Sequence, residues 1–246
     1  MKAIKYTIIL LLPILLASCG KALEVNDLIT GLEVSSTRIL AGGESKVEVR
    51  AKVNRNADAE RRVVILSATS GSFLNTEGND TIRVKAVPNE SGDLIAKAVF
   101  IAPSIPDSVT ITAEMEDAEE LSLVKTAELV ATSSLPQSIT LSKNQISVSG
   151  SFEDEILIKG KIKNAGGGKV SEGVKVLFED VYPNGNPVGG HYNETSLVSN
   201  AASEVSTKYS PGTFTSDTLI LMICRIVDEN NNPLGISDII EIPVKP

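Results

Sequence analysis

The chain has 246 residues, a length that suits one large domain or two of average size. Hydrophobic residues make up 42% and charged residues 22%, which is typical of globular proteins and excludes wholesale disorder. A net charge of −8 with scattered Lys and Arg excludes a typical nucleic-acid-binding protein, because phosphate neutralisation needs clustered bases. Aromatic residues make up only 4%, which disfavours sites built on exposed aromatic rings.

The first eighteen residues have the features of a bacterial export signal. Lys2 and Lys5 form a short basic region, and the apolar run Ile8–Leu16 is too short to span a bilayer as a stable helix. The sequence Leu16-Ala17-Ser18-Cys19 follows and resembles the bacterial lipobox. The resemblance implies cleavage between Ser18 and Cys19 and lipidation of the Cys19 thiol. An ordinary secretory signal with an incidental Cys, or an uncleaved anchor, is the alternative.

The mature chain would begin at Cys19, with residues 19–27 as a short tether. Removal of the signal deletes two of the 23 bases and none of the 31 acids, which leaves a charge of −10. Anionic headgroups would repel such a chain, so we expect membrane attachment through the lipid on Cys19 alone. Gly20 differs from the Asp that retains many proteobacterial lipoproteins at the inner membrane. The resemblance therefore favours the outer membrane and leaves open its periplasmic or cell-surface side.

Beyond Cys19, period-two alternation recurs and no sustained helical stripe is present. Val47, Val49, Ala51 and Val53 alternate with charged residues, which is typical of a half-buried antiparallel strand. Similar alternation recurs at 81–86, 108–113, 156–162, 174–178 and 205–209, with Gly, Pro and Asn clusters between the runs. Cys224, in the apolar run 219–227, is expected to be a buried core residue. The pattern predicts an all-β fold of the sandwich or barrel type.

An internal repeat divides the chain. Leu32-Glu33-Val34-Ser35, followed by Ile39, matches Ile139-Thr140-Leu141-Ser142, followed by Ile146, at an offset of 107 residues. The same offset extends to the pair Val49 and Ile156. A period of this length corresponds to one sandwich. We therefore expect two tandem immunoglobulin-like β-sandwiches, over residues 28–132 and 137–246, joined by a linker at 133–136 with limited relative motion.

The second copy resembles bacterial immunoglobulin-like domains of the invasin/intimin type. The resemblance rests on a Gly-containing turn followed by alternating Val and a terminal Phe, at Asn164, Gly168, Val170, Val174, Val176 and Phe178. In the first copy, Asn89 to Ala96 and Pro103 to Ala113 resemble later parts of the same pattern. The first copy lacks the Gly-rich turn, and the second lacks the later glycine. Domains of this type serve as rigid spacers or adhesive modules, which is the role that the resemblance implies.

No catalytic constellation is evident, and we expect neither an enzyme nor a cofactor. His191 is the only histidine, and no Gly-x-Ser-x-Gly elbow is present. One histidine and one unlipidated cysteine cannot complete a zinc site, which needs about four ligands. Asp228 to Asn232 begins like a calcium loop, but Ile239 occupies its twelfth position, so we interpret it as a hairpin turn. Calcium bound by acidic loops stays the alternative.

Two further motifs have simple interpretations. Gly166-Gly167-Gly168-Lys169 lacks the spacing of a phosphate-binding loop and is interpreted as a flexible loop. Asp80-Thr81-Ile82, Asp107-Ser108-Val109 and Asp217-Thr218-Leu219 resemble the sequence that Bacteroidetes O-glycosylate on exported proteins. Asp followed by Ser or Thr is also common where strands begin.

The expected function is that of a lipid-anchored envelope protein that acts as a spacer or adhesive module. The candidate binding loop is Pro183 to Tyr192, the longest irregular segment, with Tyr182, His191 and Tyr192 as its candidate contact residues. The ligand would be a protein or a glycan. Two alternatives stay open: a carbohydrate-binding accessory lipoprotein of a glycan-uptake system, and a subunit that exchanges a β-strand during assembly.

Overall fold

The computed structural model describes residues 28–57, 59, 62–116, 124–151 and 153–246. The predicted cleavage and lipidation at Ser18 and Cys19 lie outside these residues. The described part of the chain is built from strands and contains no helix, which confirms the predicted all-β fold. Accordingly, no helix in this part is long and apolar enough to cross a membrane.

The strands β1 to β10 form the first sandwich from two sheets. One sheet has the order β1-β3-β8-β5, with β7 also paired to β8, and the other has the order β2-β10-β9-β4-β6. The bounds are β1 Ile29–Val34, β2 Arg38–Leu40, β3 Lys46–Val53, β4 Val63–Ala68, β5 Ser72–Phe73, β6 Thr81–Lys85, β7 Val87–Pro88, β8 Leu94–Ile101, β9 Asp107–Met115 and β10 Lys125–Thr132.

The strands β11 to β19 form the second sandwich in the same way. Its sheets have the orders β11-β13-β17-β15 and β12-β19-β18-β14-β16. The bounds are β11 Ser138–Lys143, β12 Val148–Ser149, β13 Ile156–Lys163, β14 Lys175–Val181, β15 His191–Tyr192, β16 Ser196–Val198, β17 Glu204–Ser210, β18 Thr218–Val227 and β19 Pro233–Lys245.

Both sandwiches begin with the same crossover. The first strand pairs antiparallel with the third, and the chain then passes to the opposite sheet, where a short strand runs parallel to the last one. These short strands are β2 beside β10 and β12 beside β19. Alternation explains which face of each strand is buried: in β3, Val47, Val49, Ala51 and Val53 point into the core.

Each sandwich has its own core with an aromatic residue at the equivalent position. Phe100 packs edge-to-face on Phe73 in the first core, with ring centroids 5.7 Å apart. Tyr209 packs against Tyr192 in the second core, with centroids 4.9 Å apart. Phe100 lies opposite Val47, and Tyr209 lies opposite Ile156. Equivalent residues in these strands are therefore 109 positions apart.

The predicted repeat of 107 residues is wrong by two positions from the crossover strand onward. The buried equivalent of Ile39 is Val148, because both lie in the short strand that runs parallel to the last strand. Ile146, which the ungapped repeat matches to Ile39, lies outside the strands and is 86% exposed. Two extra residues in the loop before Val148 account for the difference.

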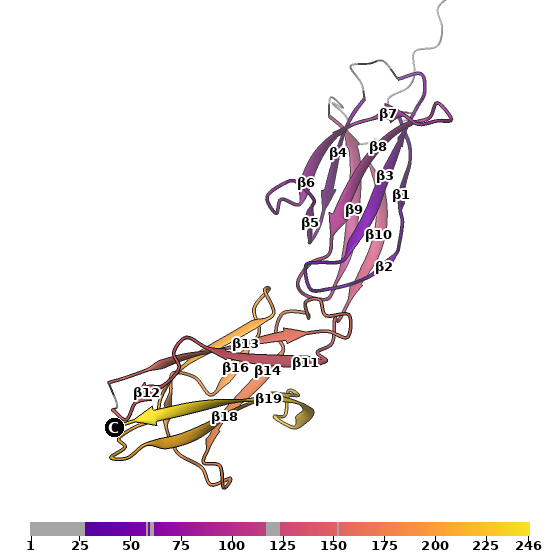
Figure 1. Ribbon diagram of the computed structural model, residues 1–246. Helices are drawn as coiled ribbons and strands as arrows, with labels where there is room; N and C mark the ends of the chain where they lie inside the picture. The colour runs from indigo at the N-terminus through magenta and orange to yellow at the C-terminus, as the bar shows by residue number, and fades with distance from the viewer. Residues whose placement is uncertain (1–27, 58, 60–61, 117–123, 152) are drawn as a thin grey trace, which may run out of the picture.

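Figure 1 shows the two sandwiches end to end, with an angle between them. The first described residue, Leu28, lies at the end of the first sandwich away from the second, where its carbonyl accepts a hydrogen bond from Asn54 N. The strand β13 runs toward the first sandwich and β14 runs away from it. The loop after β14 therefore lies at the free end of the second sandwich.

Candidate functional site

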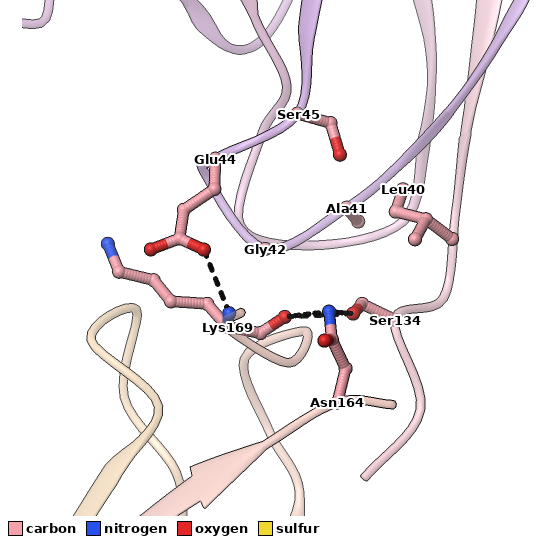
Figure 2. Close-up of a pocket in the computed structure, with 8 residues that line it drawn as sticks. All are labelled: Leu40, Ala41, Gly42, Glu44, Ser45, Ser134, Asn164 and Lys169. Carbon is pink, nitrogen blue, oxygen red and sulfur yellow. Dashed lines mark hydrogen bonds between the residues drawn. The ribbon is translucent and has the colours of Figure 1, made fainter. Parts of the chain in front are cut away.

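Four segments converge where the sandwiches meet, and we call this region the joint. It consists of the β2–β3 loop (41–45), the β8–β9 loop (102–106), the linker (133–137) and the β13–β14 loop (164–174). Figure 2 shows the first, third and fourth of these around a small crevice. The contacts come from loops because the ends of the strands carry the turns that face the neighbouring sandwich.

Asn164 is the centre of the joint. Its side-chain Oδ1 accepts hydrogen bonds from Gly166 N at 2.9 Å and Gly168 N at 3.0 Å, which closes the loop on itself. Its Nδ2 donates to Ser134 Oγ at 3.0 Å and to Lys169 O at 2.9 Å (Figure 2). One amide group therefore shapes the glycine-rich loop and ties that loop to the linker.

Two contacts join the sandwiches directly. The Glu44 carboxylate of the first sandwich accepts a hydrogen bond from Lys169 N of the second at 2.9 Å (Figure 2). On the other side, Glu172 N donates to Ser104 O at 2.9 Å, and Ser104 Oγ donates to the Glu172 carboxylate at 2.8 Å. The bonds to a carboxylate are charge-assisted, which makes them stronger than neutral ones.

The linker is held in place by Ser134, which is only 2% exposed. Its backbone N donates to Ser171 Oγ at 2.8 Å, and its carbonyl accepts from Ser171 N at 3.0 Å. Its hydroxyl donates to Lys169 O at 2.8 Å. Because its polar groups are satisfied by the second sandwich, the linker is part of the joint rather than a free tether.

Gly42 allows the two backbones to approach each other. A Cβ atom at this position would lie 3.2 Å from the carbonyl oxygens of Lys169 and Val170, and the residue has a φ of +131°. Any larger residue would push the second sandwich away and would also strain the backbone. The close approach supports a fixed arrangement of the sandwiches.

The interpretation of Gly166–Lys169 as a flexible loop is therefore wrong. The loop is closed by Asn164 and docked on Glu44 and Ser134. These partners lie far away in the sequence, Glu44 by 125 residues, so no local pattern reveals them.

The crevice in the joint has a volume of about 170 Å³ and a polar lining. It is lined by Leu40, Ala41, Gly42, Glu44, Ser45, Ser134, Asn164 and Lys169. Within the described ranges, no group of three or more His, Cys, Asp or Glu side chains is placed to hold a metal ion. We therefore assign the joint a mechanical role, in which its hydrogen bonds fix one sandwich relative to the other.

The candidate binding loop lies at the opposite end of the second sandwich. His191 is exposed and Tyr182 is half-exposed, whereas the Tyr192 ring turns inward against Tyr209. The Tyr192 hydroxyl lies 3.4 Å from Met222 Sδ. The structure thus brings the three residues to one end of the sandwich, but they do not form a single exposed aromatic face.

A buried acid fixes the base of this loop. Asp180 is 8% exposed, and its Oδ2 accepts hydrogen bonds from Gly190 N at 2.7 Å and Tyr209 OH at 2.9 Å. Burial, together with the Asp180 charge, raises the pKa of both Tyr209 and Tyr192 above the ordinary value. Gly190 has no room for a side chain, because a Cβ atom would lie 2.5 Å from the Tyr209 hydroxyl oxygen. Sequence reasoning missed Asp180, whose role depends on non-local contacts.

Two further predictions are confirmed. Cys224 is a fully buried residue of β18, and burial, followed by the nearby Asp238 charge, raises the pKa of its thiol to about 12. Asp228 lies in the turn between β18 and β19, where its carboxylate accepts hydrogen bonds from Asn230 N and Asn232 N at 2.9 and 2.8 Å. These bonds, that from the Asn232 side chain first, lower the pKa of Asp228. The hairpin interpretation therefore holds.

The three candidate glycosylation sequences lie where strands begin. Thr81 starts β6, Ser108 is the second residue of β9, and Thr218 starts β18. Thr81 and Ser108 are exposed, and Thr218 is partly buried. Their position fits the strand-start interpretation, and O-glycosylation stays a prediction.

Comparison with known proteins bears on the fold. No protein-family model matches the chain, and no curated protein matches it significantly. Among solved structures, the chain is similar to invasin, described as a bacterial integrin-binding protein, with a TM-score of 0.53 and 16% identity. The match covers 86% of this chain and 38% of invasin. The Yersinia pseudotuberculosis adhesin InvE matches with a TM-score of 0.42 and 13% identity, over 87% of this chain and 58% of InvE.

The chain has an invasin-type immunoglobulin-like fold. This agrees with the resemblance drawn from Asn164 to Phe178. At 16% identity the likeness concerns the fold alone, and the chain spans well under two thirds of the length of either structure.

Proposed function

We propose that this protein is a lipid-anchored, non-enzymatic component of the cell envelope, in which two stiffly joined sandwiches present a binding surface away from the membrane. The observation that carries the proposal is the joint, where hydrogen bonds from Asn164, Glu44 and Ser134 fix the sandwiches end to end. A lipid on Cys19 would attach the chain near Leu28, at the end of the first sandwich opposite the joint.

The free end of the second sandwich is the proposed binding surface. It carries the loop from Pro183 to Tyr192, which Asp180 fixes through Gly190 N. A fixed loop loses less conformational entropy when it binds than a mobile one does. It would lie furthest from the membrane, where a partner outside the protein can reach it.

A protein is the proposed class of ligand. The inward ring of Tyr192 removes one of the few aromatic platforms on which a sugar could stack. Invasin, which shares the fold, is described as an integrin-binding protein. Glycan binding through Tyr182 and His191 is the alternative.

Membrane fractionation tests the anchor. In the full-length chain, Cys19→Ser should prevent lipidation, so the protein should accumulate unprocessed or leave the membrane fraction. The matched control is Cys224→Ser, which alters the other cysteine and should leave processing and fractionation unchanged. Normal processing and membrane retention of Cys19→Ser would overturn the anchoring proposal.

Exposure and ligand class are tested separately. Protease treatment of intact cells should remove the second sandwich if the protein faces outward, whereas survival of the protein places it in the periplasm. The purified mature chain should give no binder on a glycan array. A specific glycan hit that His191→Ala or Tyr182→Ala abolishes would replace the protein ligand with the alternative.

A further inference from the structure

The strand β18 is apolar on both of its faces. Ile220, Met222 and Cys224 point inward and are fully buried. The alternating residues Leu219, Leu221 and Ile223 point outward and are only partly buried. A strand of an antiparallel sheet that faces water normally alternates between apolar and polar residues, so this outer side is unusual.

The neighbouring strands extend the apolar surface. On β19, Ile239 lies beside Ile223 and Pro243 lies beside Leu219. On β14, Val181 lies beside Leu221. Ile239 is 55% exposed. We call the outward residues of β14, β18 and β19 the outer face of the second sandwich.

The first sandwich provides an internal comparison. Its strand β9 has the same place in the sheet as β18, and its buried residues Val109, Ile111 and Ala113 correspond to Ile220, Met222 and Cys224. The outward residues Ser108, Thr110 and Thr112 then correspond to Leu219, Leu221 and Ile223. The same position of one fold is polar in one copy and apolar in the other, so the fold itself does not require the apolar surface.

The outer face is not covered by the first sandwich. Figure 1 shows β18 and β19 on the side of the second sandwich that faces away from the first. The joint residues Asn164, Lys169 and Glu172 lie in a loop that belongs to neither strand. This surface is therefore available to another molecule.

We propose that the outer face packs against the same face of a second copy of this chain. The arrangement has a two-fold axis in the plane of the interface, at right angles to the strands and through the pair Ile223 and Ile239. Each strand then faces its own copy in the antiparallel direction, as in an isologous dimer. Ile223 faces Ile223 of the second copy, and Ile239 faces Ile239.

The charges around the axis are complementary under this operation. Arg225 lies two residues from Ile223 on one side, and Glu241 lies opposite Leu221 on the other. The two-fold axis therefore brings Arg225 of each copy beside Glu241 of the other. Arg225 also bonds Glu179 of its own chain at 3.1 Å, whereas Glu241 has no ion pair among the described residues. The second copy would supply the missing partner.

The size of the surface fits a stable dimer. Five strands at about 4.8 Å spacing and about 30 Å of strand length give a face of roughly 700 Å². A standard protein interface buries about 800 Å² on each partner. Two twisted sheets of this kind pack about 10 Å apart, with aligned strands.

Crosslinking of the full-length chain in cell extracts tests the dimer. Ile239→Cys places two thiols opposite each other across the axis, too far apart for a disulfide between sheets about 10 Å apart but within reach of a short bis-maleimide. Cys224 is fully buried and should not react. We expect a crosslinked band of twice the chain mass. The readout is the same whether or not the chain fractionates with membranes, so it does not depend on the proposed anchor.

Two controls make the result specific. Ile146→Cys introduces an equally accessible thiol outside the outer face and should give no such band. In the Ile239→Cys background, Ile223→Glu places two carboxylates at the axis and should reduce crosslinking at least about tenfold, whereas the equivalent Thr112→Glu in the first sandwich should not. Crosslinking no stronger than that of Ile146→Cys, or only to a different protein, would overturn the proposal.

Discussion

The sharpest test of the joint is the substitution Asn164→Ala, compared with Asn200→Ala. Both residues shape the same kind of five-residue loop. Asn200 Oδ1 accepts hydrogen bonds from Ala202 N at 2.9 Å and Glu204 N at 3.0 Å, matching the bonds of Asn164 to Gly166 N and Gly168 N. Asn164 differs in the two further bonds from its Nδ2, to Ser134 Oγ and Lys169 O.

The expected difference follows from these two bonds. A hydrogen bond inside a protein contributes about 0.5–1.5 kcal/mol to stability, so Asn164→Ala should cost about 1–3 kcal/mol more than Asn200→Ala. The assay is urea unfolding of the mature chain, followed by tyrosine fluorescence. The chain has no Trp, and its tyrosines beyond residue 18 are Tyr182, Tyr192 and Tyr209, so the signal reports on the second sandwich alone.

Equal losses for the two variants would refute this reasoning. They would mean that the Nδ2 bonds of Asn164 contribute nothing, and that the linker is held by other contacts.

Three further predictions concern the second core. Gly190→Ala should destabilise the protein by about 1–3 kcal/mol in a thermal melt, because the added methyl group would overlap the Tyr209 ring, and Gly31→Ala, whose nearest neighbour is 3.8 Å away, should cost less; equal effects would contradict the close packing. The Cys224 thiol, with its pKa raised to about 12, should react with a thiol reagent at pH 8 only after denaturant is added, and rapid reaction of the native protein would contradict its burial. Because the folded-state pKa of Cys224, Tyr192 and Tyr209 is raised, their contribution to stability is complete below about pH 9 and is lost as the pH rises above it. Phenolate absorbance from Tyr192 and Tyr209 should therefore appear together with unfolding in an alkaline titration, and gradual ionisation of the folded protein would count against it.

The fold could be predicted from the sequence where its signals are local. Alternation in Val47, Val49 and Ala51 depends on side chains two residues apart, and it identified the strand and its buried face correctly. The crossover strands are only two or three residues long, which is too short for alternation to fix their register. The match of Ile39 to Ile146 instead of Val148 follows from that limit.

The candidate site was less predictable because its contacts join distant parts of the chain. Nothing near Gly166 indicates that Glu44 and Ser134 hold the loop in place. A glycine-rich sequence fits a mobile loop as well as a tightly closed one. Likewise, Tyr192 is exposed or buried depending on whether Tyr209 lies beneath it, which only the pairing of β15 with β17 decides.

The most direct test of the stiff spacer is the tumbling of the two sandwiches in solution. Backbone ¹⁵N relaxation of the mature chain gives a rotational correlation time for each sandwich separately. If the joint fixes them, both sandwiches should tumble as one elongated body, and Asn164→Ala should make their motions more independent. Separate, short correlation times in the unaltered protein would show that the sandwiches move independently and would contradict the account.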